Sequence, residues 1–237
     1  MQPRTAIIIV AGGGGTRLGG AVPKQFRVLG TRPVLAHTLD RFHRALPAAQ
    51  LIVVLPEAHI DYWNHLRARF EVPAHTVVAG GAERYHSVRN GLAAVAYDAA
   101  IVGVQDAVRP LTSERLIRRA AAEAEQFGSA IPVIEAVDSY RSLTGDGSSQ
   151  HLDRRTLRIV QTPQFFRREL LDRAYQLPYS ATITDDASLI EALGEEVHLC
   201  EGERSNLKIT LPDDLVIAAA LLEAETQTPA KEDDTHL

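Results

Sequence analysis

The chain has 237 residues and a formal net charge of −5, with 45% hydrophobic and 23% charged residues. This composition is typical of a folded globular protein, and the acidic balance without a long basic run argues against a nucleic-acid partner. The single cysteine, Cys200, excludes an intramolecular disulfide, and the longest apolar run, 215–222, is too short to cross a membrane. We therefore expect one α/β domain over residues 1–225, in the cytoplasm and with no membrane partner.

Two kinds of segment alternate through the first half of the chain. Apolar, β-branched runs predict strands at 6–10, 51–55, 76–78, 101–104 and 130–134. Apolar residues at three- and four-residue spacing predict the helices between them, at 34–44, 60–70, 84–95 and 113–127. This alternation is typical of a Rossmann-like α/β fold, a mostly parallel sheet with helices on both faces, whose ligands bind at the carboxyl ends of the strands.

The alternation breaks at 138–158, where a strong turn signal, Thr144-Gly145-Asp146-Gly147, separates two polar, strand-like arms. These residues predict a β-hairpin with little apolar surface to bury, which we expect to project from the domain. Beyond it we expect helices at 167–177, 186–193 and 213–225, short strands at 197–199 and 207–210, and a polar, flexible tail at 226–237.

A glycine-rich loop follows the first predicted strand. Positions 12–15 are all glycine, and Arg17 and Lys24 follow. Glycine lets backbone N–H groups approach phosphate oxygens, and the cations supply charge, so the loop is predicted to bind a triphosphate. It is not a P-loop, because Thr16-Arg17 follows Gly15, and Arg17 also stands where a G-x-G-x-x-G pattern needs its third glycine.

Further polar residues follow other predicted strands. Gly80-Gly81-Ala82 would let a base or ribose approach the backbone, and Ser87 would either bind a pyrimidine edge or cap the segment. Asp106, with Arg109 close behind it, would bind a substrate hydroxyl or help to hold Mg²⁺, and the residues alone leave both roles open.

The second half of the chain adds scattered cations and hydroxyls. They lie in Asp153-Arg154, Thr162-Pro163-Gln164, 182–186 and 206–210. Together they form the donor set that a phosphorylated polyol requires, although each is weak alone.

In fixed order along nearly the whole chain, these segments resemble the 2-C-methyl-D-erythritol 4-phosphate cytidylyltransferase family. The motifs that carry the resemblance are Ala11-Gly12-Gly13, Gly15-Thr16-Arg17-Leu18, Pro23-Lys24-Gln25-Phe26, Gly80-Gly81, Glu83-Arg84, Ser87-Val88, Asp106-Ala107-Val108-Arg109-Pro110, Asp153-Arg154, Gln161-Thr162-Pro163-Gln164-Phe165, Thr184-Asp185-Asp186-Ala187-Ser188 and Asn206-Leu207-Lys208-Ile209-Thr210. Leu18 replaces a methionine that is usual in the family. Gln105 stands where many members have histidine, and Ser139 where threonine is common.

The resemblance implies a nucleotide-diphospho-sugar transferase type of fold and transfer of CMP from CTP to methylerythritol phosphate, with Mg²⁺ and release of pyrophosphate. Arg17 and Lys24 would stabilise the pentavalent α-phosphate, and Arg154 and Lys208 would position the attacking phosphate, which needs no protein base. The implied CTP-binding residues are Ala11, Gly12, Gly13, Gly15, Gly81 and Ser87. The implied polyol-binding residues are Asp106, Arg109, Ser139, Thr162 and Thr184.

The resemblance also implies a homodimer. In this family the hairpin, here 138–158, clasps its twin, so Ser139 and Arg154 would serve the neighbouring subunit's site. Activity would then depend on dimerisation.

Two alternatives stay open. A cytidylyltransferase for another polyol phosphate, such as ribitol 5-phosphate, would share the glycine loop, Pro-Lys-Gln and Asn-Leu-Lys-Ile-Thr. A nucleotide-binding regulatory protein would bind CTP without catalysis, although the intact set of cations argues against it.

Overall fold

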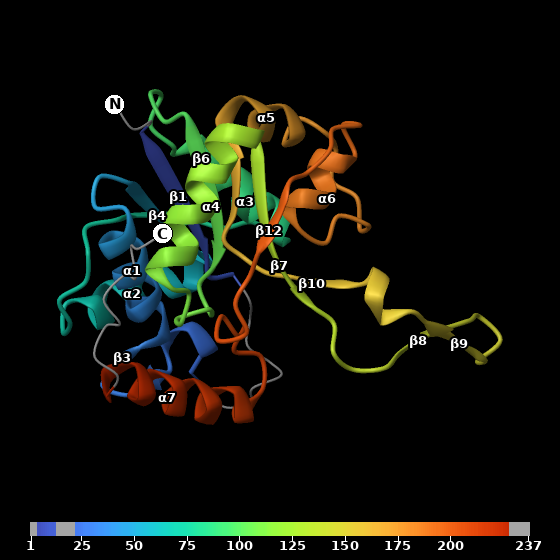
Figure 1. Cartoon of the computed structure of the whole chain (residues 1–237). Coiled ribbons are helices and arrows are strands. Elements are labelled where there is room, and N and C mark those ends of the chain that lie inside the picture. Colours follow the sequence, from blue (N-terminus) through green and yellow to red (C-terminus); the bar gives the residue numbers. More distant parts are fainter. Residues whose placement is uncertain (1–3, 13–21, 228–237) are drawn as a thin grey trace, which may run out of the picture.

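The computed structural model describes residues 4–12 and 22–227. These residues form one mixed sheet of eight strands, in the order β10-β7-β11-β6-β1-β4-β5, with β12 paired to β7 (Figure 1). Its strands are β1 (Thr5–Val10), β4 (Gln50–Leu55), β5 (Thr76–Ala79), β6 (Ile101–Asp106), β7 (Ser129–Glu135), β10 (Arg158–Val160), β11 (Gln164–Arg167) and β12 (Leu199–Glu201). The predicted α/β fold is thereby confirmed. Within the described ranges, no helix combines the length and apolar character that a membrane span needs.

The central strands of the sheet run parallel. β1 pairs in parallel with both β4 and β6, and β4 pairs in parallel with β5. β6 includes Gln105 and Asp106, so Asp106 ends this strand rather than following it. Because parallel strands end at the same edge of a sheet, the segments after β1, β5 and β6 lie close together.

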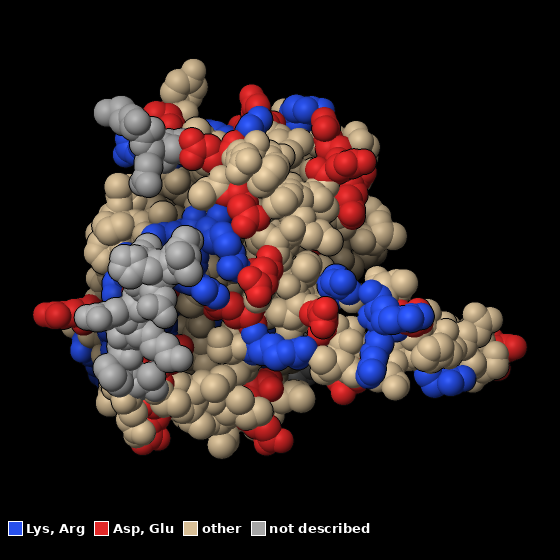
Figure 2. Space-filling model, in the orientation of Figure 1, with Lys and Arg blue, Asp and Glu red and all other residues tan. Residues whose placement is uncertain are grey.

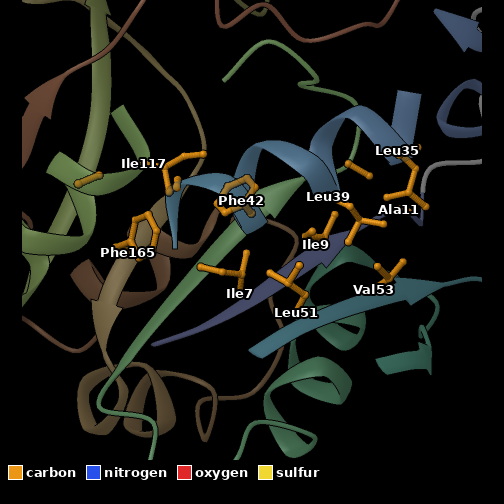
Figure 3. Packing of buried hydrophobic residues seen from close by; sticks show 14 of the residues in the cluster. Ile7, Ile9, Ala11, Leu35, Leu39, Phe42, Leu51, Val53, Ile117 and Phe165 are labelled. Carbon is orange, nitrogen blue, oxygen red and sulfur yellow. The ribbon is translucent and has the colours of Figure 1, made fainter. Parts of the chain in front are cut away.

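Helices cover both faces of this sheet. On one face lie α1 (Val34–Ala45), α2 (Glu57–Arg67) and α4 (Glu114–Phe127), and on the other α3 (Arg84–Ala93), α5 (Arg168–Ala174) and α6 (Asp186–Glu191). Figure 3 shows Ile7 and Ile9 of β1 packed beneath Leu39 and Phe42 of α1. The intervening Ile8 belongs to the cluster on the opposite face. β1 is therefore apolar throughout because neighbouring side chains enter two separate cores.

One strand that the sequence does not predict, β11, inserts antiparallel between β6 and β7. Phe165 and Phe166 are fully buried, one on each face of the sheet. Phe165 lies opposite Gly103 of β6, and a Cβ at Gly103 would stand 2.5 Å from the ring. β11 thus depends on a glycine distant in sequence. It is only four residues long and directly follows a proline, and the proline masks the strand pattern.

The predicted hairpin is present. β8 (Tyr140–Leu143) pairs antiparallel with β9 (Ser149–Leu152), and a 3-10 turn (Arg154–Thr156) follows. In Figure 1 the arm, residues 138–158, extends away from the body of the domain. Leu143 at its far end is 80% exposed. The arm therefore has no core of its own against which its apolar side chains could pack.

The C-terminal segment differs from the prediction in two respects. Residues 207–210 are not a strand, although the Ile209 N–H donates to the Val108 carbonyl at 2.9 Å. The last helix, α7 (Pro212–Gln227), includes Thr226 and Gln227, so it is longer than predicted and the polar tail is shorter. It packs near a two-stranded ribbon of β2 (Val28–Leu29) and β3 (Arg32–Pro33) through a small cluster that contains Ile209 and Ala218.

A partly buried hydrogen bond fixes the tautomer of one histidine. Trp63 of α2, the only tryptophan, is fully buried, and its Nε1–H donates to His75 Nε2 at 3.0 Å. Since an indole nitrogen only donates, His75 Nε2 carries no proton, and Nδ1–H donates to the Pro73 carbonyl at 2.7 Å. Burial lowers the pKa of His75 below 6.5, and the nearby Arg67 acts in the same direction.

This arrangement predicts an acid-sensitive fluorescence signal. The unfolded chain takes up the proton first, so the His75 contribution to stability is complete above pH 6.5 and is lost as pH falls toward the folded-state pKa. We expect Trp63 emission to titrate below pH 6.5, and His75→Gln to abolish that titration. His59→Gln is the matched control, because His59 lies on α2, the helix that carries Trp63, and its ring contacts Phe26. A titration that persists in His75→Gln but vanishes in His59→Gln would show that the signal comes from His59, and would contradict this prediction.

Candidate active site

Two adjoining cavities open at the carboxyl edge of the parallel strands. The first, of about 310 Å³, is lined by residues that include Ala11, Gly12, Lys24, Gly81 and Ser87. The second, of about 430 Å³, is lined by residues that include Arg109, Thr162 and Thr184. Arg84, Asp106 and Lys208 line both. A larger hollow of about 720 Å³ at the opposite edge contains none of the predicted site residues.

A tight glycine turn forms one wall of the first cavity. The Gly81 N–H donates to Ser87 Oγ at 3.1 Å, and Ser87 Oγ donates to the Glu83 carbonyl at 3.2 Å. A Cβ at Gly81 would lie 2.3 Å from His86 Cβ, so a larger residue could not fold back against α3. Ser87 is 3% exposed. It therefore closes the turn, as the capping alternative predicted, and it also lines the cavity.

The segment that carries Lys24 is anchored at two points. Gln25 is buried, and its Nε2 donates to the Ala11 carbonyl at 2.9 Å, directly after β1. Phe26 is also buried, and its ring stacks on Trp63 of α2 with centroids 6.0 Å apart. Lys24 is thereby held at the first cavity. Of the remaining residues predicted in this loop, Gly13, Gly15 and Arg17 lie outside the described residues.

Asp106 is the electrostatic centre of the site. Its Oδ2 lies 3.0 Å from Lys208 Nζ and 3.4 Å from Arg109 Nε, and its Oδ1 lies 3.9 Å from Arg84 Nε. Burial alone would raise the pKa of Asp106, but the positive charges of Arg84, Lys208 and Arg109 outweigh it and hold the pKa at about 2. The carboxylate is therefore ionised and fixed at the boundary between the cavities.

A buried amide joins three parts of the chain behind Asp106. Asn206 is fully buried, and its Nδ2 donates to the Thr162 carbonyl at 2.9 Å. The backbone carbonyl of Asn206 accepts from Arg109 Nη1 at 2.7 Å. Thr162 Oγ1 accepts from the Asp106 N–H at 3.0 Å. Asn206 therefore sets the position of the segment that carries Lys208. The motif that contains Asn206 is visible in the sequence, but its partners, far along the chain, are not.

Gln105, which departs from the family pattern, belongs to the same network. It is fully buried, and its Nε2 donates to Thr112 Oγ1 at 3.0 Å. Thr112 Oγ1 in turn donates to Asn206 Oδ1 at 2.8 Å. Gln105 therefore supports the site from behind and does not line either cavity.

Two predicted residues lie away from these cavities. Ser139 and Arg154 line a separate hollow of about 390 Å³ on the arm, and the Arg154 guanidinium donates to the Val137 carbonyl. Figure 2 shows blue side chains gathered along the arm, where Arg154, Arg155 and Arg158 are all exposed. Within the described chain, the structure does not bring Ser139 and Arg154 together with Asp106.

A mostly parallel sheet with two cation-lined cavities at its carboxyl edge is typical of α/β enzymes that bind phosphorylated substrates at that edge. Comparison with known proteins specifies the family. The family model described as 2-C-methyl-D-erythritol 4-phosphate cytidylyltransferase matches residues 5–224, and the chain belongs to this family.

Individual relatives agree with this assignment. The chain is 47% identical over 221 residues to the 2-C-methyl-D-erythritol 4-phosphate cytidylyltransferase of Bacteroides thetaiotaomicron, covering 92% of this chain and 100% of the relative. The crystal structure of the enzyme of that name from Thermus thermophilus is 33% identical, with a TM-score of 0.71 over 94% of this chain and 100% of the other. The 4-diphosphocytidyl-2C-methyl-D-erythritol synthase of Anaerococcus prevotii is 27% identical, with a TM-score of 0.79 over 93% and 99% of the two chains.

Proposed function

We propose that this chain transfers CMP from CTP to 2-C-methyl-D-erythritol 4-phosphate, giving 4-diphosphocytidyl-2-C-methyl-D-erythritol and pyrophosphate in non-mevalonate isoprenoid biosynthesis. It is a CTP-dependent nucleotidyltransferase of its family. The observation that carries the proposal is the match to this family over residues 5–224. Two cavities that meet at Asp106 and Lys208 support it, because the reaction joins two phosphate-bearing substrates.

CTP would occupy the first cavity. Its base and ribose would lie against the turn at Gly81 and Ser87, and its triphosphate would extend along Ala11 and Gly12 toward Lys24. We assign Arg17, Gly13 and Gly15 to the same triphosphate on sequence alone. Lys24 and Arg17 would then meet the charge that develops on the α-phosphate in the transition state.

The polyol phosphate would occupy the second cavity, with its hydroxyls near Asp106, Arg109, Thr162 and Thr184. Lys208, together with Arg154, would orient its phosphate for in-line attack. One phosphate oxygen forms a bond to the α-phosphorus of CTP, and the bond from this phosphorus to the bridging oxygen breaks. Pyrophosphate leaves with that electron pair. A phosphate monoester is largely dianionic near pH 7, so no residue has to remove a proton.

We propose that Mg²⁺ enters on the phosphates of CTP rather than on a protein site. The part of the chain that the structure describes contains no group of three or more His, Cys, Asp or Glu side chains that could hold a metal ion. The oxygens of Asp106 already face Lys208, Arg109 and Arg84, which disfavours a second role as metal ligand. Bound Mg²⁺ would neutralise charge on the triphosphate.

Asp106→Asn separates the two roles considered for this carboxylate. If Asp106 binds a substrate hydroxyl, we expect the KM for the polyol phosphate to rise at least about tenfold, since a buried hydrogen bond to a charged group is lost. The Mg²⁺ concentration for half-maximal residual activity should stay within about twofold of wild type. A large shift in that Mg²⁺ requirement, with an unchanged KM for the polyol phosphate, would instead make Asp106 a metal ligand.

We further propose that the chain acts as a homodimer joined by the arm 138–158. The arm and its base expose Val137, Leu143, Leu152, Ile159 and Val160, apolar side chains that a second copy would cover. Dimerisation through the arm would also bring Ser139 and Arg154 to the second cavity of the neighbouring subunit. One folded unit over residues 1–225 would then supply each half of the dimer.

The test of the proposed substrate compares two polyol phosphates in parallel. Pyrophosphate release from CTP is measured with 2-C-methyl-D-erythritol 4-phosphate and with ribitol 5-phosphate, and we expect kcat/KM to favour the former. A preference for ribitol 5-phosphate would overturn the choice of substrate. Tight binding of CTP, with no pyrophosphate released from it in the presence of either polyol phosphate, would support the regulatory alternative.

A further inference from the structure

Arg84, the first residue of α3, contacts carboxylates from two other parts of the chain. Its Nη2 donates to Asp186 Oδ2 at 2.6 Å, and its Nε lies 3.9 Å from Asp106 Oδ1. Arg84 lines both cavities. Its guanidinium therefore stands in the wall that the two cavities share, between the nucleotide turn on one side and the start of α6 on the other.

Asp186, the partner of Arg84, is fully buried at the start of α6. Its Oδ1 accepts from the Tyr175 hydroxyl at 2.5 Å, and its N–H donates to Gln164 Oε1 at 3.1 Å. Thr184 lies two residues before Asp186 and lines the second cavity. The position of this cavity wall thus depends on what holds Asp186.

The charges around this network favour an ionised Arg84 and a protonated Tyr175. Burial opposes the charge on Arg84, yet Asp186 and Asp106 outweigh it and raise the pKa of the guanidinium. Burial, reinforced by Asp186, raises the pKa of Tyr175, so its hydroxyl stays protonated and continues to donate. The network is a fixed ion pair with a neutral donor.

An ion pair of this kind is weak evidence of a stabilising role. Taking two charges out of water costs free energy that the pairing often fails to recover, and apolar replacements of such pairs are often neutral or stabilising. The location of the ion pair is more informative. The Arg84 guanidinium faces Asp106, and Asp186, with which it pairs, lies two residues from Thr184. Both Asp106 and Thr184 are proposed to contact the polyol phosphate.

We propose that Arg84, acting through Asp106 and Asp186, is a positioning residue that holds the two walls of the polyol-phosphate cavity at the separation the substrate requires. The proposal rests on the function proposed above. Arg84 itself need not touch the polyol phosphate. CTP affinity should depend little on this ion pair, because the nucleotide turn is closed by the hydrogen bonds of Ser87.

The test compares Arg84→Met, Asp186→Asn and the double variant with wild type. Arg84→Met leaves Asp186 buried without a countercharge, so the melting temperature should fall by about 10 °C. The double variant removes both charges and should recover most of that loss. The KM for 2-C-methyl-D-erythritol 4-phosphate should nevertheless remain at least about tenfold above wild type in the double variant, with the Kd for CTP changed less than about threefold.

The matched control is Arg173→Met with Glu195→Gln. This pair joins α5 to the segment after α6 at 2.9 Å, and its side chains are 57% and 43% exposed. It lines neither cavity at Asp106, so the KM for 2-C-methyl-D-erythritol 4-phosphate and the Kd for CTP should both match wild type.

Recovery of the KM together with the melting temperature in the double variant would reduce Arg84 to a structural residue and overturn the proposal. An equal rise in the Kd for CTP would also overturn it, because the effect would then not be specific to the polyol-phosphate cavity. If the wild-type protein forms no product, the proposed function fails instead, which the assay of wild type shows before any variant is compared.

Discussion

Replacing Lys24 with alanine is expected to lower kcat by about 10²–10³ while changing the Kd for CTP by less than about threefold. Lys24 lines the nucleotide cavity and is held there because Gln25 and Phe26, the next two residues, are buried and anchored. Its charge is needed most when negative charge accumulates on the α-phosphate, so its loss should fall on the transition state. Single-turnover kinetics and equilibrium CTP binding measure the two quantities separately.

Arg27→Ala is the control for this substitution. Arg27 also belongs to the segment after the glycine loop, but its Nε donates to the Val22 carbonyl at 3.3 Å and it lines neither cavity at Asp106. We expect the kcat of the Arg27→Ala variant to stay within about threefold of wild type. An unchanged kcat in Lys24→Ala would remove Lys24 from the transition state, and an equal loss in Arg27→Ala would show that the segment, not the charge, matters.

Replacing Arg154 with alanine should be the second severe change, with a loss of about 10²-fold or more in kcat/KM for the polyol phosphate. Arg154 is exposed on the arm and lines a hollow separate from the cavities around Asp106. In our account it acts in the neighbouring subunit. The variant should still fold, dimerise and bind CTP, because its guanidinium donates only to the Val137 carbonyl among the described residues.

Mixing the two inactive variants tests this sharing of residues between subunits. A heterodimer of Lys24→Ala and Arg154→Ala would contain one site in which both residues are intact. After subunit exchange in equal amounts, activity should recover to about a quarter of the wild-type value, since half of the dimers are mixed and each has one working site. Arg155→Ala removes the neighbouring exposed cation of the arm, and it is the matched control for Arg154→Ala. Absence of recovery, with heterodimers confirmed by mass spectrometry, would place Arg154 in its own subunit's site.

Much of the fold was predictable because buried parallel strands have a local signature. The β1 and β4 strands are continuous apolar runs, since their residues enter the cores on both faces of the sheet. The arm was predictable from its turn residues and from its poor apolar face. β11 was missed because its burial depends on the space left by Gly103, a position remote in sequence.

The candidate site divides in the same way. Gly81 was predicted from its place after a strand and Lys208 from its motif, and the structure places both, with Asp106 at the end of β6, in the walls of the cavities. The roles of Arg84 and Asn206 were not predicted, because their partners lie far along the chain. Arg84 and Asp186 are 102 positions apart, and Asn206 meets Thr162 across 44. Such pairings arise only when the sheet edge assembles.

The fate of the α-phosphate of CTP tests the proposed reaction most directly. CTP labelled at the α-phosphorus is incubated with the protein, Mg²⁺ and 2-C-methyl-D-erythritol 4-phosphate, and the products are separated and identified by mass. We expect the label to move into a cytidine diphosphate ester of the polyol, with unlabelled pyrophosphate released in equal amount. Label that remains in CTP, or that moves only when ribitol 5-phosphate replaces the methylerythritol compound, would contradict it.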